Sequence, residues 1–316
     1  MRGGVFKMDR SAGALSRRGL LVSGAAAAAF ALSPSGLAGA ATEDLSFVAI
    51  GDWGFDGSPS QRRVAAAMGQ TAAAIGSRFV ISLGDNFYED GVGRFDDPRW
   101  RTAFDDVYAA PALATPWNVV LGNHDRRGNA MAQVAHSDVD GRWHMPAPYF
   151  KRRETLADGS AADFFYLDTT WIWSELGAEP PGDDADDQLA WLDQALAASQ
   201  APWKIVVGHH PVFSGGYHGN TPGLVRAVKP MLERHGVAAY LNGHDHDLQH
   251  IVVDGIHYVT CGTGADARPT SVVDGSLFAA SRLGFMAGVL TPKELSFAFM
   301  SDGGETIYRS AIPRRA

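Results

Sequence analysis

The chain has 316 residues, a formal net charge of −8, 46% hydrophobic residues and a single cysteine. The hydrophobic fraction is too high for a disordered protein, and the acidic balance argues against a general nucleic-acid binder. Cys261 has no intramolecular partner, so no disulfide framework holds the fold. The length allows one large domain or two ordinary ones.

Residues 1–40 have the features of an export signal. Arg17 and Arg18 precede an apolar, alanine-rich run, and Ala38-Gly39-Ala40 is typical of a cleavage site. The order resembles a bacterial twin-arginine signal; an ordinary secretory signal and an uncleaved anchor helix are the alternatives. We therefore expect a periplasmic or secreted protein with one domain over residues 41–316. It would not contact the membrane after signal removal, and the twin-arginine export machinery would be a candidate partner.

Five short apolar segments share one pattern, because each is followed within two residues by glycine and a side chain that can bind a metal. They lie at residues 46–50, 79–83, 117–121, 203–207 and 237–241. The pattern predicts buried strands that end in functional loops. Ligands of α/β sheets bind beyond the carboxyl ends of the strands, so we expect these loops to converge on one site.

Helices are predicted between these strands, at residues 60–76, 186–199 and 224–235, with a bend at Pro230 in the last. The final third of the chain predicts short strands instead, at 251–253, 256–259, 285–290, 295–299 and 306–308. Alternating strands and helices followed by a strand-rich tail predict an α/β fold. We expect two stacked mixed β-sheets flanked by helices on both outer faces.

The polar side chains at the strand ends are carboxylates, an amide and imidazoles: Asp52, Asp85, Asn123, His209, His244 and His246. This mixture suits iron, manganese or zinc better than calcium, which prefers oxygen donors alone. The set exceeds one tetrahedral site and suits two neighbouring ions with a bridging carboxylate. Tyr88 follows Asp85 closely and adds a phenol, which as a phenolate selects a hard cation such as Fe(III).

These residues stand in motifs that resemble those of the calcineurin-like metallophosphoesterases, specifically the small, tartrate-resistant type of purple acid phosphatase. The motifs are Gly51-Asp52-Trp53-Gly54, Gly84-Asp85-Asn86-Phe87-Tyr88, Gly122-Asn123-His124-Asp125, Gly208-His209-His210-Pro211 and Gly243-His244-Asp245-His246. The wider superfamily usually has histidine at the position of Gly54. The absence of that histidine and the presence of Tyr88 match the pattern of the purple acid phosphatases. The resemblance extends over nearly all of residues 41–316 and implies a four-layer sandwich.

The resemblance also implies a ligand set and an activity. Fe(III) would be bound by Asp52, Asp85, Tyr88 and His246, and a divalent iron, zinc or manganese ion by Asp85, Asn123, His209 and His244. His124 and His218 match positions that family members use to bind phosphate and assist the leaving group. The implied enzyme is an acid phosphatase that hydrolyses small phosphate monoesters by attack of a metal-activated hydroxide. No nucleic-acid partner is expected.

Two other functions stay open: a phosphodiesterase or nucleotidase of the same superfamily, and a non-catalytic protein that binds metal or phosphate. The chain also departs from the mammalian type. Trp173 and Gly223 stand where that type has two disulfide-forming cysteines, and the loop at 174–187 is shorter than the loop that regulates access to the mammalian site.

Other residues of these motifs receive supporting roles. Asp125 and Asp245 are expected to support ligands or form turns, and Asp168 to orient a ligand histidine. His210 has two open interpretations, a structural role or a role in the pocket.

Overall fold

The computed structural model describes residues 44–173 and 185–315. The predicted export signal and most of the loop at 174–187 lie outside these described residues. The described part falls within one compact unit, Ser33–Ala316. None of its helices combines the length and the hydrophobicity that a membrane crossing requires.

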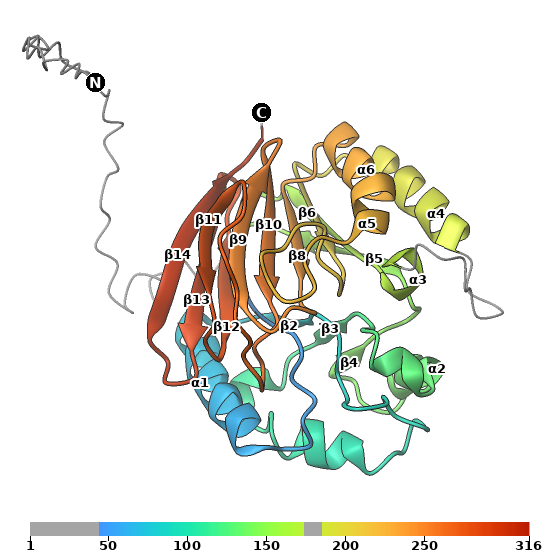
Figure 1. Cartoon of the computed structure of the whole chain (residues 1–316), viewed down its shortest axis with the longest axis vertical. Coiled ribbons are helices and arrows are strands. Elements are labelled where there is room, and N and C mark those ends of the chain that lie inside the picture. Colours follow the sequence, from blue (N-terminus) through green and yellow to red (C-terminus); the bar gives the residue numbers. More distant parts are fainter. Residues whose placement is uncertain (1–43, 174–184, 316) are drawn as a thin grey trace, which may run out of the picture. The chain divides into compact units, whose positions relative to one another are not determined.

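Two seven-stranded sheets form the centre of the fold (Figure 1). The first has the order β14-β13-β12-β1-β2-β3-β4. Its strands are β1 (Leu45–Ile50), β2 (Phe79–Ser82), β3 (Trp117–Val119), β4 (Trp143–His144), β12 (Gly284–Leu290), β13 (Glu294–Ser301) and β14 (Thr306–Pro313). β1 to β4 run parallel, whereas the three C-terminal strands add in antiparallel pairs, so the sheet is mixed.

The second sheet has the order β11-β9-β10-β8-β7-β6-β5. Its strands are β5 (Phe150–Thr155), β6 (Ala161–Tyr166), β7 (Trp203–Val207), β8 (Ala239–Asn242), β9 (Leu248–Val253), β10 (Ile256–Cys261) and β11 (Ser276–Ala280). Parallel pairing joins β6, β7, β8 and β10, and the outer strands are antiparallel. In both sheets the central strands are parallel, so the loops that follow their carboxyl ends lie at one edge of the sheet and can carry a site.

Three buried hydrophobic clusters separate four layers. The cluster between the sheets contains Phe47 of β1 and Phe164 of β6, whose rings meet edge to face at 6.1 Å. Helix α1 (Pro59–Ile75) packs on the outer face of the first sheet. Helices α4 (Ala185–Ala198), α5 (Pro222–Ala227) and α6 (Lys229–Arg234) cover the second sheet, where Leu192 and Leu196 pack with Val206. The predicted fold class is confirmed.

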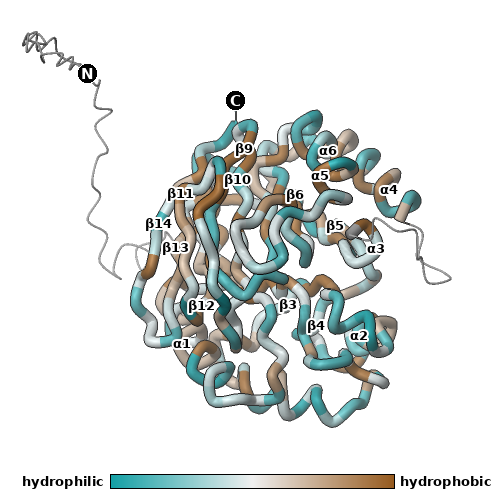
Figure 2. Tube along the Cα trace, viewed as in Figure 1, coloured by the Kyte–Doolittle hydropathy of each residue, from teal (hydrophilic) through white to brown (hydrophobic). Residues whose placement is uncertain are grey.

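The helix boundaries follow local chemistry. Ser58 caps α1 by accepting a hydrogen bond from the backbone N–H of Gln61, and Gly76 ends the helix in the left-handed conformation. Along α4, hydrophobic and hydrophilic residues alternate (Figure 2), as expected for a helix that buries one face. Shorter helical segments are Trp100–Asp105, Pro111–Leu113, Asp125–Arg127, α2 (Ala130–His136) and α3 (Thr170–Trp173).

One predicted helix differs from the structure. The segment 224–235 forms two short helices, α5 and α6, which meet at Val228. Pro230 lies in the first turn of α6, where its missing N–H costs nothing and its fixed φ suits a helix start. The proline therefore begins a new helix instead of bending a continuous one.

Candidate metal centre

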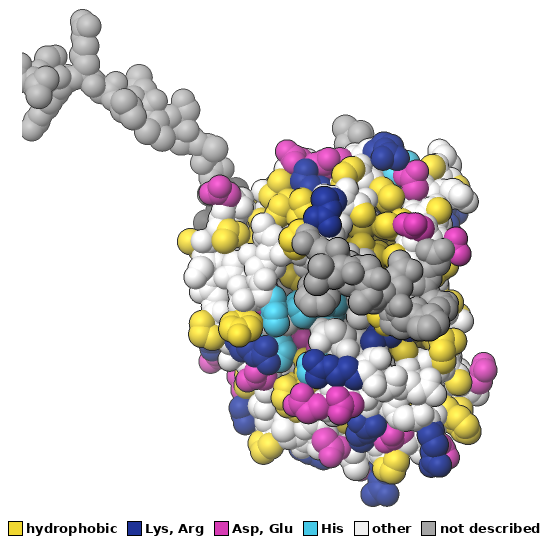
Figure 3. All heavy atoms as spheres, turned by 45° about the vertical axis from the view of Figure 1, so that its right-hand side comes forward, with side chains coloured by type: hydrophobic (Ala, Val, Ile, Leu, Met, Phe, Trp, Pro, Cys, Tyr) yellow, Lys and Arg dark blue, Asp and Glu magenta, His cyan; other side chains and the backbone are white. Residues whose placement is uncertain are grey.

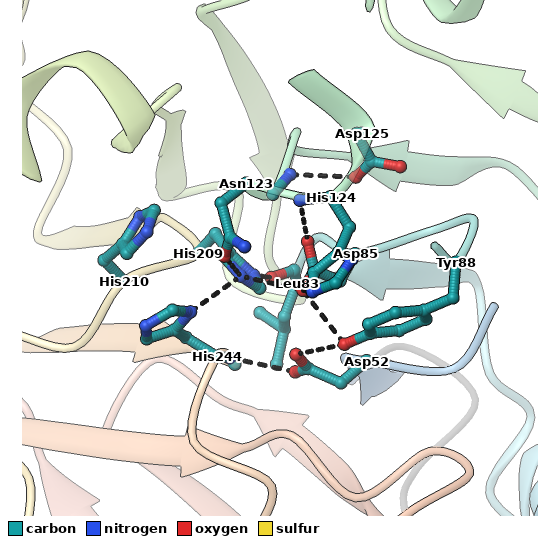
Figure 4. A network of polar contacts seen from close by, with 12 residues as sticks. Asp52, Leu83, Asp85, Tyr88, Asn123, His124, Asp125, His209, His210 and His244 are labelled. Atoms are coloured by element: carbon teal, nitrogen blue, oxygen red, sulfur yellow. Dashed lines mark hydrogen bonds and ion pairs between the residues drawn. The ribbon is translucent and has the colours of Figure 1, made fainter. Parts of the chain in front are cut away.

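Loops after the carboxyl ends of the parallel strands bring the predicted ligands together (Figure 4). Asp52 follows β1, Asp85 and Tyr88 follow β2, and Asn123 follows β3 of the first sheet. His209 follows β7, and His244 and His246 follow β8 of the second sheet. The centre therefore lies where the ends of the two sheets face each other, and neither sheet supplies it alone.

Three of these residues have left-handed backbone conformations, with φ of 57° at Asp52, 50° at Asp85 and 69° at His244. Such conformations cost about 1–3 kcal/mol in a non-glycine residue and persist where the surroundings require them. Glycines provide the space for the side chains: a Cβ on Gly122 would overlap the Asp85 carboxylate. The glycines at the strand ends thus serve the packing of the site.

Several atoms that could bind a metal ion surround the hydroxyl of Tyr88. Its Oη lies 3.1 Å from Asp52 Oδ1, 2.9 Å from Asp85 Oδ2 and 3.0 Å from His246 Nε2. A phenol has one proton and satisfies only one of these acceptors. His246 Nδ1 donates to Asp266 Oδ2 at 3.0 Å, which in the neutral imidazole leaves Nε2 as a lone pair facing Tyr88. This crowding of lone pairs fits a bound cation.

A second group of possible metal-binding atoms surrounds the imidazole of His209. Its Nδ1 donates to the backbone carbonyl of Leu83 at 2.8 Å, so in the neutral ring Nε2 is an acceptor. That Nε2 lies 3.2 Å from Asn123 Oδ1, 3.2 Å from His244 Nδ1 and 3.4 Å from Asp85 Oδ2. Asp85 belongs to both groups, as a bridging carboxylate would.

The electrostatics of the centre favour positive charge. Burial lowers the pKa of His209, but the charges of Asp85 and Asp52 outweigh burial and raise the pKa to about 10. Burial, followed by the nearby Asp85 and Asp52, raises the pKa of Tyr88 well above its usual value. Burial and the neighbouring imidazoles lower the pKa of His244, which keeps this ring neutral and able to bind a metal.

The two candidate catalytic histidines lie beside these groups. The backbone N–H of His124 donates to Asp85 Oδ1 at 2.8 Å, and its Nδ1 donates to the carbonyl of Glu89 at 2.6 Å. The ring of His218 lies 4.2 Å from the ring of His244, and its backbone N–H donates to Asp245 Oδ1 at 2.9 Å. Figure 3 shows histidine side chains gathered on one face, with acidic and basic side chains beside them.

The supporting roles are clear for several neighbours. Asp125 accepts backbone N–H groups from Asn86 at 3.1 Å, Phe87 at 3.2 Å and Gly122 at 2.8 Å, so it joins the loops after β2 and β3. His210 Nδ1 lies 2.9 Å from the Thr169 hydroxyl, which also accepts the His210 backbone N–H. These contacts support the structural interpretation of His210.

Asp168 differs from its predicted role of orienting a ligand histidine. The structure pairs it with Arg126, whose Nε donates to Asp168 Oδ2 at 2.6 Å. Both side chains are buried, and the pair connects the loop after β3 to the loop after β6. Burial of a carboxylate is costly, and here the guanidinium offsets that cost.

Asp266 is a candidate supporting residue that the sequence patterns did not reveal. It follows β10 in Gly262-Thr263-Gly264-Ala265-Asp266, a further strand that ends in glycine and a carboxylate. That recurrence of the strand-end pattern could have identified it. Gly54 is explained as well, because a Cβ there would overlap the backbone of Asn86 and a histidine has no room.

The layered sheets and the donors at their facing ends define a metallophosphoesterase. A family model described as calcineurin-like phosphoesterase matches residues 45–248, which is more than half of the chain. Tartrate-resistant acid phosphatase type 5 of rabbit (Oryctolagus cuniculus) is 37% identical over 304 residues, covering 87% of this chain and 93% of the rabbit protein. Purple acid phosphatase 4 of Arabidopsis thaliana is 36% identical over 288 residues, covering 84% and 82%. The chain therefore belongs to the tartrate-resistant and purple acid phosphatases within the calcineurin-like phosphoesterase family.

A solved structure also resembles the fold closely. It is described as "GAP50 the anchor in the inner membrane complex of Plasmodium", with a TM-score of 0.79 and 29% identity. The match covers 86% of this chain and 90% of the Plasmodium chain.

Proposed function

We propose that the protein is an acid phosphatase that hydrolyses phosphate monoesters at a two-metal centre. The observation that carries the proposal is the position of Asp85, whose Oδ2 lies 2.9 Å from Tyr88 Oη and 3.4 Å from His209 Nε2. The carboxylate of Asp85 thus lies between the phenol of Tyr88 and the imidazole of His209. The similarity to acid phosphatases over most of the chain supports the same activity.

The chemistry of the two groups suggests the metals. The phenol and carboxylates of Asp52, Asp85 and Tyr88, with His246, suit Fe(III), because anionic oxygen donors prefer a hard cation. Asp85, Asn123, His209 and His244 suit a divalent iron, zinc or manganese ion. When bound, the two ions supply an activated solvent nucleophile and neutralise charge on the phosphate.

The two histidines beside the centre act on the ester. His124 Nδ1 is held by the Glu89 carbonyl, and its Nε2 is turned toward the centre, 4.0 Å from Asp85 Oδ2. From this position Nε2 can donate a proton to the departing alkoxide. His218, whose ring packs on that of His244, is assigned a hydrogen bond to the phosphate.

The substrate class is tested by comparing a monoaryl and a bis-aryl phosphate with metal-loaded protein between pH 4 and pH 8. We expect the monoester to have the higher kcat/KM, with an optimum on the acidic side. A preference for the diester would instead favour a phosphodiesterase or nucleotidase of the same superfamily. Metal analysis and a visible spectrum of the same sample test for iron paired with a divalent ion.

A non-catalytic protein that binds metal or phosphate is the second candidate. The two candidates differ in turnover. If metal-loaded protein binds inorganic phosphate but hydrolyses neither ester, the proposed phosphatase function is wrong and a binding function takes its place.

Residues 1–40 are proposed to be a twin-arginine signal that directs the single domain at 41–316 to the periplasm or the medium. The support is the arginine pair ahead of an apolar run. Arg17→Lys combined with Arg18→Lys should leave the protein uncleaved inside the cell. Continued export of this double variant would point to an ordinary secretory signal.

A further inference from the structure

Tyr217 presents a large aromatic ring to solvent next to the candidate metal centre. The residue is 76% exposed, and its ring lies edge to face with the ring of His218 at 5.0 Å. The ring of His218 in turn lies 4.2 Å from that of His244. Tyr217 is therefore the outermost of three successive rings that begin at a candidate metal ligand.

Hydrogen bonds hold the loop that carries Tyr217, at residues 214–219. The backbone N–H of Gly215 donates to Gln249 Oε1 at 2.7 Å, and that of His218 donates to Asp245 Oδ1 at 2.9 Å. A Cβ on Gly216 would overlap the Asp245 carboxylate, so the loop is packed closely against β9 and the loop before it. These contacts fix the backbone on both sides of Tyr217, and the exposed ring leaves its apolar surface available to a ligand.

The surroundings of Tyr217 add apolar surface. Ser271 donates its backbone N–H to the carbonyl of Gly215 at 2.9 Å, which places the next segment beside the loop. That segment continues with Val272 and Val273, which are 74% and 38% exposed. Figure 3 shows hydrophobic side chains near the histidines on this face. The exposed ring of Tyr217 and these valines can pack against a flat, uncharged group.

We propose that Tyr217 is a specificity-determining residue that stacks against the leaving group and favours phosphate monoesters of aromatic alcohols. The inference rests on the proposed phosphatase function. In an aryl phosphate one oxygen joins the ring to phosphorus, so with the phosphate at the centre we expect that ring next to His218, with Tyr217 as the next ring outward. A small alkyl phosphate has no planar face for this contact, and a nucleoside monophosphate separates its base from phosphorus by the sugar.

The test compares kcat/KM for phenyl phosphate and for glycerol 2-phosphate. Tyr217→Ala should lower the value for phenyl phosphate about three- to tenfold, the size expected for one aromatic stacking contact, and change that for glycerol 2-phosphate less than twofold. Tyr217→Phe keeps the ring and should retain the preference. Val139→Ala, at a residue of similar exposure beyond α2, is the control for removing a surface side chain.

The outcomes separate the two proposals. An unchanged ratio of the two kcat/KM values in Tyr217→Ala, or an equal loss for both substrates, overturns the specificity role and leaves the phosphatase intact. If the unaltered protein hydrolyses neither substrate, the phosphatase function fails and the specificity role fails with it. Inhibition by inorganic phosphate should be the same in all variants, because Tyr217 is assigned to the leaving group and not to the phosphate.

Discussion

Asp266 Oδ2 accepts a hydrogen bond of 3.0 Å from Nδ1 of His246, whose Nε2 faces Tyr88. Nε of Arg268 lies 3.3 Å from the same carboxylate oxygen. A carboxylate behind an imidazole fixes the orientation of the ring and increases its basicity as a metal ligand. We therefore expect Asp266 to act on the candidate centre through His246.

Asp266→Ala should lower metal affinity on the Tyr88 side by about 10- to 100-fold, the range for losing such a partner. Metal retention against a chelator measures this loss independently of turnover. Asp266→Asn keeps an acceptor oxygen, so its metal affinity should lie between those of Asp266→Ala and the unaltered protein. Asp138→Ala, an exposed aspartate after α2, is the matched control. Equal metal retention by Asp266→Ala and the unaltered protein would remove this role.

Tyr88→Phe should abolish the visible colour of a tyrosinate–Fe(III) centre, because the phenolate oxygen is the group that gives rise to it. The fold should persist, since the ring still packs against Phe55 at 4.3 Å. Absorption spectra of iron-loaded protein check this, with Tyr149→Phe as the control. Unaltered protein that is colourless and holds zinc in both positions would contradict the iron assignment but not hydrolysis.

His124→Ala should keep the metals and lose about a hundredfold to ten-thousandfold in kcat, the usual contribution of a general acid. The backbone N–H of residue 124 still donates to Asp85 in this variant, because that contact does not involve the ring. The loss should be smaller for para-nitrophenyl phosphate than for an alkyl phosphate, since nitrophenolate leaves without a proton. An identical loss for both esters would assign the ring to phosphate binding instead.

We expect His250 to make the stability of the folded protein depend on pH. Burial, and then the charge of His257, lowers the pKa of His250 from 6.5 to about 4 in the folded protein. Its Nε2 lies 2.8 Å from His257 Nδ1, and its Nδ1 lies 3.0 Å from the Tyr308 hydroxyl. Between these two pKa values the unfolded chain binds more protons, so the free energy of unfolding should increase with pH from about 4 to 6.5.

The matched experiment compares His250→Gln with the unaltered protein by urea unfolding at pH 4.5 and pH 7. The variant should lose less stability on acidification, by roughly 1–3 kcal/mol, because it has no proton to take up. The comparison between variants cancels the pH dependence of metal binding, which both proteins share. Equal pH dependence in the two proteins would show that His250 does not control this loss.

Local sequence was informative about the strands because a buried strand and its terminal turn leave a contiguous pattern. The apolar run of β1 and the glycine after it predicted both the strand and the place of Asp52. The same logic did not reveal β5, an edge strand whose residues Arg152, Arg153 and Glu154 interrupt any apolar run. Edge strands carry charge on an exposed side, so their pattern is weaker.

The sequence by itself determined the types of the candidate ligands, because each stands within a few residues of a strand end and its glycine. Tertiary structure alone decided the partners across the two sheets. Asp266 reached His246 and Asp168 reached Arg126 through contacts between separate loops, and the exposure of Tyr217 follows from how its loop packs on β9. Such contacts depend on how strands order and stack, and no local spacing encodes that arrangement.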